Sequence, residues 1–286
     1  MTDRRIIDAH HHIWDLSARP QPWITGEALA PLDRSFSVAD LQPEARAAGV
    51  RATVVVQTVC VPEETPELLA VAQAGDLVAG VVGWTDLTAP DIADRLAELL
   101  EGPGGERLVG IRHQVQEEPD PGWLLRPDVR RGLAAVAAAG LAFDLVVRPG
   151  QLAAAVAAAA GLTGLTFVLD HLGKPPVAEG RSEPWARDLR RLAALPNTVC
   201  KLSGLITEAT PGVWSIEDLR PYTDTVLEAF GPYRLLFGSD WPVCTLEADY
   251  GRTLFVAEEL TASLSPTEKE MIFHRNATRV YDLRLP

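Results

Sequence analysis

The chain has 286 residues, of which 47% are hydrophobic and 23% charged. This composition is ordinary for a globular protein and excludes a largely disordered chain, a collagen-like repeat and a long coiled coil. Lysine and arginine number 26 and aspartate and glutamate 39, which gives a formal net charge of −13. Such a charge would repel a phosphate backbone or an anionic membrane surface, so we expect neither nucleic acid nor membrane as a partner.

Cysteine usage indicates a reducing environment. Cys60, Cys200 and Cys244 are far apart and form no CxxC pair, so a disulfide framework is not expected. The first eight residues include basic side chains but lead into no apolar signal-peptide core. We therefore expect a cytoplasmic protein.

Short apolar runs recur along the chain, and each ends in polar or glycine-rich residues. They are apolar on both faces over most of their length, as buried parallel strands are. The pattern predicts eight strands: Ile6–His12, Ala52–Thr58, Val78–Thr85, Leu108–Val115, Ala142–Arg148, Thr166–His171, Thr198–Gly204 and Leu235–Asp240.

Segments with helical spacing separate these runs. Examples are Pro90–Leu100, Asp128–Ala139, Leu152–Ala160, Trp185–Leu195 and Leu219–Phe230. From Ile7 in the first run to Phe237 in the eighth, the mean interval is about 33 residues, the length of one βα unit. We therefore predict an α/β protein that folds as one (β/α)8 TIM barrel spanning residues 1–286. A doubly wound sheet is the alternative, but the first run leads into three histidines rather than the glycine-rich turn of that fold.

The remaining segments have predicted places around this barrel. Leu16–Pro43 is long and rich in proline, which favours a loop over the barrel mouth. After Asp240, helices over Ala248–Leu260 and Pro266–Tyr281 are expected to complete the outer ring.

The first predicted strand ends in consecutive histidines. Side chains two apart on a strand share a face, so His10 and His12 point one way and His11 the other. Two imidazoles at the carboxyl end of an inward face can bind one divalent metal. A metal-free histidine network is the alternative reading of this pattern.

Two distant residues strengthen the metal interpretation. His171 ends the sixth predicted strand and Asp240 the eighth, and barrel enzymes place their sites at the carboxyl ends of strands. A carboxylate beside a metal-bound water can act as general base. We predict His10, His12, His171 and Asp240 as metal ligands, with Asp240 and His171 also catalytic.

Substrate contacts are predicted from the fourth strand. Its apolar residues alternate with Arg112 and Gln114, which places both in the lumen and His113 on the outer face. An inward arginine can bind substrate oxygens or form an ion pair with a buried acid such as Asp8.

Other candidate contacts lie at the strand ends and in the mouth loop. Each lysine either binds substrate oxygens or pairs with Asp170 or Asp8, and the arginine either contacts an anionic substrate or does not. Each tryptophan either stacks on a sugar face or packs beneath the loop. These alternatives stay open for Lys174, Lys201, Arg148, Trp14, Trp23 and Trp241. With Arg112, the cations suggest a pocket that is locally positive within an acidic chain.

Four motifs together carry a resemblance to a known family. They are IDxHxHxW (residues 7–14), LDHLGKPP (169–176), CKLSGL (200–205) and LLFGSDWPVC (235–244). In this order they resemble the lactonase branch of the amidohydrolase superfamily, which includes L-fuconolactonases, other sugar-lactone hydrolases and 2-pyrone-4,6-dicarboxylate lactonase. The resemblance implies a TIM barrel that hydrolyses a small cyclic ester, with a sugar-acid lactone such as L-fuconolactone or L-rhamnonolactone as the expected substrate in carbohydrate metabolism.

The sequence departs from the binuclear members of that superfamily. The fourth strand has no bridging lysine or glutamate, and the fifth ends in Arg148 rather than histidine. We therefore expect one divalent metal, zinc in particular, or none. A metal-dependent decarboxylase and a pyrone-dicarboxylate lactonase are the alternative enzymes, although the decarboxylase would need the missing histidine. A barrel kept only as a binding scaffold is the non-enzymatic alternative.

Overall fold

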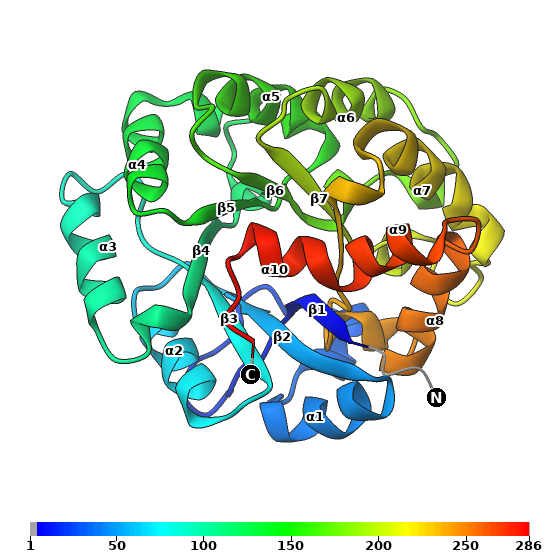
Figure 1. The fold of residues 1–286 in the computed structure, drawn as a ribbon, viewed down its shortest axis with the longest axis horizontal. Coiled ribbons are helices and arrows are strands. Elements are labelled where there is room, and N and C mark those ends of the chain that lie inside the picture. Colours follow the sequence, from blue (N-terminus) through cyan, green and yellow to red (C-terminus); the bar gives the residue numbers. More distant parts are fainter. Residues whose placement is uncertain (1–4, 286) are drawn as a thin grey trace.

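The computed structural model describes residues 5–285. They form an eight-stranded parallel sheet in sequential order that curls into a barrel, with helices around it (Figure 1). A parallel bridge between His11 and Trp241 joins the last strand region to the first. This arrangement confirms the predicted (β/α)8 class. The strands are β1 (Ile6–His11), β2 (Val50–Val56), β3 (Val78–Gly83), β4 (Leu108–His113), β5 (Ala142–Leu145), β6 (Phe167–Leu169), β7 (Thr198–Leu202) and β8 (Leu235–Phe237).

The strands stop earlier than their apolar runs predicted. β6 ends at Leu169 and β8 at Phe237, two and three residues before the predicted strand ends at His171 and Asp240. The backbone leaves the ladder here because His171 and Asp240 adopt left-handed conformations, with φ of 52° and 58°. His12, His171 and Asp240 therefore lie just beyond the strands, at the barrel mouth.

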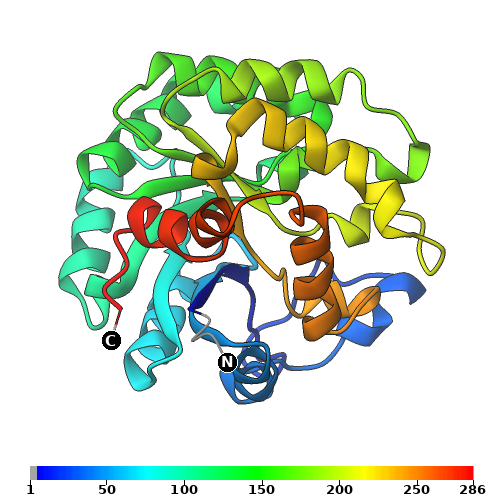
Figure 2. The same ribbon diagram turned by 45° about the vertical axis from the view of Figure 1, so that its right-hand side comes forward.

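Most of the helices cover the outside of the sheet (Figures 1 and 2). In the part of the chain that the structure describes, none is long and apolar enough to cross a membrane. The helices are α1 (Val38–Ala47), α2 (Glu64–Ala74), α3 (Ile92–Glu101), α4 (Pro127–Ala138), α5 (Leu152–Gly161), α6 (Trp185–Ala193), α7 (Ile216–Phe230), α8 (Tyr250–Leu260), α9 (Pro266–Glu270) and α10 (Asn276–Val280).

The predicted mouth loop contains the start of a helix. Ser37 and Asp40 form a reciprocal capping box, which begins α1 at Val38 rather than after Pro43. Such a box satisfies two backbone donors that a helix start leaves open. The proline content of the segment therefore predicted too late a start for this helix. The remaining loop still covers the mouth, because Trp14 pairs with Phe36 through two backbone hydrogen bonds of 2.9 and 2.8 Å.

The C-terminal segment also differs from expectation. The predicted helix Pro266–Tyr281 is interrupted by a π-helical turn at Met271–Arg275, and α10 lies across the centre of the barrel instead of within the outer ring (Figure 1). Ala277, Tyr281 and Leu283 pack against the inward-facing aliphatic residues of the strands. The chain therefore closes the amino-terminal end of the barrel with its own C-terminal segment and leaves the opposite end for a site.

Candidate active site

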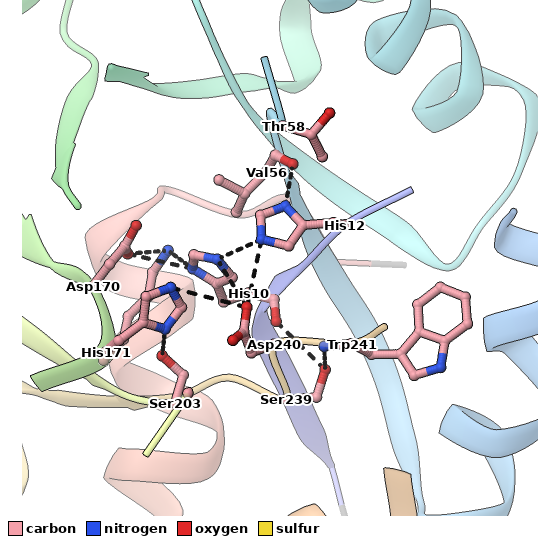
Figure 3. A network of polar contacts seen from close by, with 12 residues as sticks. His10, His12, Val56, Thr58, Asp170, His171, Ser203, Ser239, Asp240 and Trp241 are labelled. Carbon is pink, nitrogen blue, oxygen red and sulfur yellow. Dashed lines mark hydrogen bonds and ion pairs between the residues drawn. The ribbon is translucent and has the colours of Figure 1, made fainter. Parts of the chain in front are cut away.

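Three imidazoles and one carboxylate converge at the open end of the barrel (Figure 3). Nε2 of His10 lies 3.1 Å from Nε2 of His12. Oδ1 of Asp240 lies 3.7 Å from His10 Nε2, 3.5 Å from His12 Nε2 and 3.9 Å from His171 Nε2. The structure thus brings together all four residues that the sequence analysis predicted as metal ligands.

Hydrogen bonds on the far side of each ring orient these imidazoles. Nδ1 of His12 donates to the carbonyl of Val56 at 2.8 Å, and Nδ1 of His171 lies 3.0 Å from Oγ of Ser203 (Figure 3). His11 faces the other side of β1, where its Nε2 contacts Oγ1 of Thr53 at 2.9 Å. The alternation along β1 therefore directs two of the three histidines to the mouth, as predicted.

Burial and mutual proximity set the charge states in this cluster. Burial and the Lys201 ammonium hold the pKa of His10 well below its ordinary value, and burial lowers the pKa of His171 to about 4. For Asp240, burial acts to raise the pKa, but the neighbouring His171, His12 and His10 outweigh it and lower the pKa. Near neutral pH the cluster thus combines neutral His10 and His171 with an ionised carboxylate, the forms that bind a divalent metal.

Two glycines allow the backbone to approach the cluster. Gly204 has φ of +61°, and a Cβ built on it would lie 2.5 Å from Nδ1 of His171 and 3.1 Å from Oδ2 of Asp240. A Cβ on Gly238 would lie 2.7 Å from that of His10. Close packing around the site therefore explains why the CKLSGL and LLFGSD motifs have glycine at these positions.

A buried carboxylate ties the first strand to the last. Asp8 accepts hydrogen bonds from the backbone NH and Oγ of Ser239 at 2.8 and 2.6 Å, from the NH of His10 and from the hydroxyl of Tyr250. These contacts fix the turn that carries Asp240. From the sequence, Asp8 was expected only as a partner for a cation; its hydrogen-bond partners are instead neutral donors.

A buried ionic network lies below the cluster. Lys201 contacts Asp144 at 2.6 Å and Asp170 at 3.0 Å, and Asp170 also contacts Nη1 of Arg112 at 3.0 Å. Nε of Arg112 donates to the side chain of Gln57 at 2.8 Å. Lys201 is fully buried. The alternative of a structural ion pair, left open for Arg112 and Lys201, therefore describes their main contacts.

A pocket of about 540 Å³ opens above the cluster and includes His12, His171 and Asp240 in its wall. The mouth loop contributes Pro22, Trp23 and Leu29, and the ends of β2 and β4 contribute polar side chains. This volume is in the range of small-molecule sites. Its polar wall includes Thr58, Arg112, Gln114, Gln116 and Lys174.

The pocket wall includes only some of the predicted substrate contacts. Arg112, Lys174 and Trp23 line it. Trp14 and Trp241 instead pack around Phe36, with ring centroids 5.0 and 5.4 Å from it, in the apolar layer beneath the loop. Their packing alternative matches the structure.

Arg148 and His113 also lie outside the pocket wall. Arg148 is exposed and pairs with Glu117 at 3.1 Å, because β5 ends three residues before it. His113 stacks on Trp123 and contacts Glu118 at 2.7 Å on the outer face of β4, which agrees with its predicted outward register.

Sequence reasoning missed several residues that support the cluster. Asp144 and Ser203 were not predicted as parts of the site, and Asp170 was predicted only as a possible partner of Lys174 or Lys201. Polar residues within otherwise apolar strand ends are the signal that could have identified them. Apart from the pairing of Asp170 with Lys201, which the structure shows at 3.0 Å, their partners could not be identified, because each contact joins segments that are distant in sequence.

The donor set fits a single divalent metal. Two ligands bound at about 2.0–2.1 Å to one tetrahedral zinc lie about 3.3 Å apart. The separations of 3.1, 3.5 and 3.7 Å among His10 Nε2, His12 Nε2 and Asp240 Oδ1 bracket that value. Two imidazoles and a carboxylate with room for water form the ligand type of catalytic zinc sites.

Comparison with known proteins places the chain among similar sequences and structures. The model of the amidohydrolase family matches residues 7–283. The L-fucono-1,5-lactonase of Burkholderia ambifaria is 39% identical and that of Burkholderia multivorans 38%; each alignment covers 98% of this chain and at least 96% of the relative. A crystal structure of an amidohydrolase from Burkholderia multivorans with bound zinc superposes with a TM-score of 0.93 at 38% identity, over 98% of this chain and all of that one. The chain belongs to the amidohydrolase family.

Proposed function

We propose that this chain is a hydrolase that opens a neutral sugar-acid lactone. The observation that carries the proposal is the convergence of His10, His12, His171 and Asp240 at the base of a pocket of about 540 Å³. The two L-fucono-1,5-lactonases are similar to this chain over nearly its whole length, and their similarity supports this substrate class. Its physiological place is carbohydrate metabolism in the cytoplasm, a location that the three free cysteines support.

Asp240 is the proposed general base. Its carboxylate lies at the pocket floor and is ionised near neutral pH, because the surrounding imidazoles lower its pKa. It can accept a proton from a water molecule that attacks the lactone carbonyl, and later return it to the leaving ring oxygen. Its left-handed backbone, held by the Asp8–Ser239 contacts, aims the carboxylate at His10 and His12.

His10, His12 and Asp240 would hold the metal, which is zinc in our proposal. The bound cation would act as a Lewis acid on the lactone carbonyl. His171, oriented by Ser203, has its Nε2 3.9 Å from Oδ1 of Asp240 and lines the pocket. Its neutral ring can donate from Nε2 to the developing oxyanion when Ser203 donates to Nδ1. A donor of this kind contributes about 3–4 kcal/mol to transition-state stabilisation.

The charges of the pocket favour a substrate with hydroxyl groups over a dicarboxylate. Among the described residues, the charged side chains of the wall are Arg112, Lys174, Glu117 and Asp240, two of each sign. Arg112 is paired with Asp170 and Lys174 with Glu208. Apart from a bound metal, the described pocket wall therefore offers no unpaired cation to an anionic substrate. The locally positive pocket expected from the sequence is replaced by one with balanced charges.

A panel of lactones tests the proposal. The purified chain, supplied with zinc, is incubated with neutral aldono-1,5- and 1,4-lactones, and acid release is followed with a pH indicator. We expect hydrolysis of at least one neutral aldonolactone with kcat/KM above about 10⁴ M⁻¹s⁻¹, the lower end of the usual enzyme range. Absence of hydrolysis across the panel at millimolar concentration would overturn the proposal.

A further inference from the structure

Lys201 lies against the side of His10 that faces away from the pocket. Its Nζ lies 2.6 Å from Oδ2 of Asp144, 3.0 Å from Oδ1 of Asp170 and 2.9 Å from Nδ1 of His10. Tyr281 donates its hydroxyl to the same oxygen of Asp144 at 2.8 Å. The ammonium group has three hydrogens and no acceptor. Two of the three hydrogens therefore have defined acceptors, Oδ2 of Asp144 and Nδ1 of His10, while Asp170 contributes an ion pair.

This contact determines where a neutral His10 carries its proton. Because the ammonium of Lys201 can only donate, Nδ1 of His10 must accept, and the single N–H of the neutral ring is on Nε2. Nε2 lies 3.1 Å from Nε2 of His12. His12 donates from its Nδ1 to the carbonyl of Val56, so in a neutral His12 ring Nε2 is an acceptor. A series of hydrogen bonds, each donated in the same direction, thus connects Lys201 through His10 and His12 to the carbonyl of Val56.

The Nε2–H form has one conflict, because its Nε2–H faces the donor Nη1 of Arg112 at 3.4 Å. The opposite tautomer has longer contacts and two conflicts. It would donate from Nδ1 to Oδ1 of Asp170 at 3.3 Å and accept at Nε2 from Nη1 of Arg112 at 3.4 Å. Its Nδ1–H would then face the ammonium of Lys201 at 2.9 Å, and the bare Nε2 atoms of His10 and His12 would face each other at 3.1 Å. A cation between the two Nε2 atoms removes the second conflict but not the first.

We propose that Lys201 is a positioning residue that holds His10 in the Nε2–H form and thereby weakens cation binding by the His10, His12 and Asp240 cluster. The inference rests on the metal site of the proposed function. It concerns the proton position and the affinity of that site, so its tests use no lactone. Failure of the lactone assay and failure of this inference are therefore separate results.

Nitrogen NMR of the metal-free chain tests the proton position directly. In uniformly ¹⁵N-labelled protein, the ring signals of His10 are assigned by their loss in His10→Gln. We expect Nδ1 to have the shift of an unprotonated ring nitrogen and Nε2 that of a protonated one. A His10 that carries its proton on Nδ1 in the metal-free wild-type chain would overturn the inference. This measurement needs no change at Lys201.

Zinc affinity of variants tests the consequence. Lys201→Met replaces the ammonium with an apolar side chain of similar length, so the donor to His10 is lost. We expect zinc to bind about tenfold more tightly, measured by competition with a chelator. A change of this magnitude is typical when a residue that contacts a metal ligand is replaced. If Lys201 only stabilised the fold, its replacement would weaken zinc binding instead. Lys174→Met is the matched control, because it removes a pocket lysine paired with Glu208 rather than with a ligand, and we expect less than about threefold change.

A double variant addresses folding of the substituted chain. Lys201→Met leaves Asp144 without its cation, so Lys201→Met/Asp144→Asn removes both charges of the 2.6 Å pair while Asp170 keeps Arg112. The same tightening is expected from this variant. Unchanged or weaker zinc binding in whichever variant folds would contradict the inference, as would equal tightening in Lys174→Met.

Discussion

At the residue scale, the site depends on one carboxylate whose position and charge are both set by neighbours. Asp240 is buried, left-handed in its backbone and surrounded by three imidazoles. Strained residues of this kind persist where the surrounding structure fixes them, and they cluster at functional sites. Here the fixing contacts come from Asp8 and Ser239, so geometry and chemistry can be tested separately.

Asp240→Asn keeps the shape of the side chain and removes its basicity. Asparagine tolerates the left-handed region, so we expect an unchanged melting temperature. We expect kcat for a sugar lactone to fall by about 10²–10⁴, the range for loss of a general base. Steady-state kinetics at saturating substrate measure this. Activity within a few-fold of wild type would show that another group activates water.

Arg112 shows how the structure changes a prediction made from sequence. As an inward arginine it was expected to bind substrate, and truncation would then affect mainly KM. Because it is buried and paired with Asp170 and Gln57, Arg112→Ala should also lower the free energy of unfolding. The expected loss is about 3–5 kcal/mol, as for breaking a buried ion pair.

Arg148→Ala is the control for that measurement. This side chain is 61% exposed and lies outside the pocket wall, so its removal should leave the urea unfolding midpoint unchanged. Equal midpoints for Arg112→Ala and wild type would contradict a structural role for Arg112. The sequence could place Arg112 inside the barrel from strand alternation, but its partner Asp170 lies 58 residues away and cannot be inferred from local pattern.

At the scale of elements, the site is built by the turns that follow the strands. Periodicity identified all eight strands and the alternation of His10, His11 and His12, because both depend on local sequence. It could not identify where each strand leaves the ladder. That point depends on backbone conformations such as those of His171 and Asp240, which contacts between strands impose.

The turn after β7 gives a test of this view. Gly204→Ala places a methyl group where a Cβ would lie 2.5 Å from His171 Nδ1. We expect kcat/KM to fall at least about 100-fold, because displacement of a catalytic group by about 1 Å can cost that much. The change in kcat/KM for a hydrolysed lactone is the measurement.

Gly212→Ala is its matched control. Gly212 also has a left-handed backbone, with φ of +71°, but no atom of residues 5–285 lies within 4 Å of a Cβ built there. Both substitutions carry the same backbone cost, about 1–2 kcal/mol. Only Gly204→Ala should reduce activity. A similar loss of activity in both variants would assign the effect to backbone strain rather than to displacement of His171.

At the scale of the whole molecule, the packing that stabilises the fold and the residues of the proposed site lie at opposite ends of the barrel. The C-terminal segment closes one end, where Ala277, Tyr281 and Leu283 pack into the aliphatic interior, and the polar cluster occupies the other. The chain carries a net charge of −13, yet its pocket wall holds equal numbers of acidic and basic side chains. An overall charge therefore says little about the substrate of a buried site.

The metal content of the whole chain follows from its ligand set. The ligands His10, His12 and Asp240 should bind about one divalent ion per chain when the protein is produced with zinc, because no bridging residue for a second ion is present on β4 or at the end of β5. Elemental analysis together with protein quantification measures this. Two tightly bound ions per chain, or full activity after complete chelation, would contradict it.

The central claim is that this pocket hydrolyses a neutral sugar lactone. The most direct test is the ratio of kcat/KM for a neutral aldono-1,5-lactone to that for 2-pyrone-4,6-dicarboxylate, measured on one preparation of the chain. We predict a ratio of at least about 100, since the cations of the wall are already paired and a single bound metal leaves at least one carboxylate without a partner, and an unpaired charge costs more than 1–3 kcal/mol. Turnover of the dicarboxylate alone, with neutral aldonolactones ignored at millimolar concentration, would contradict the claim.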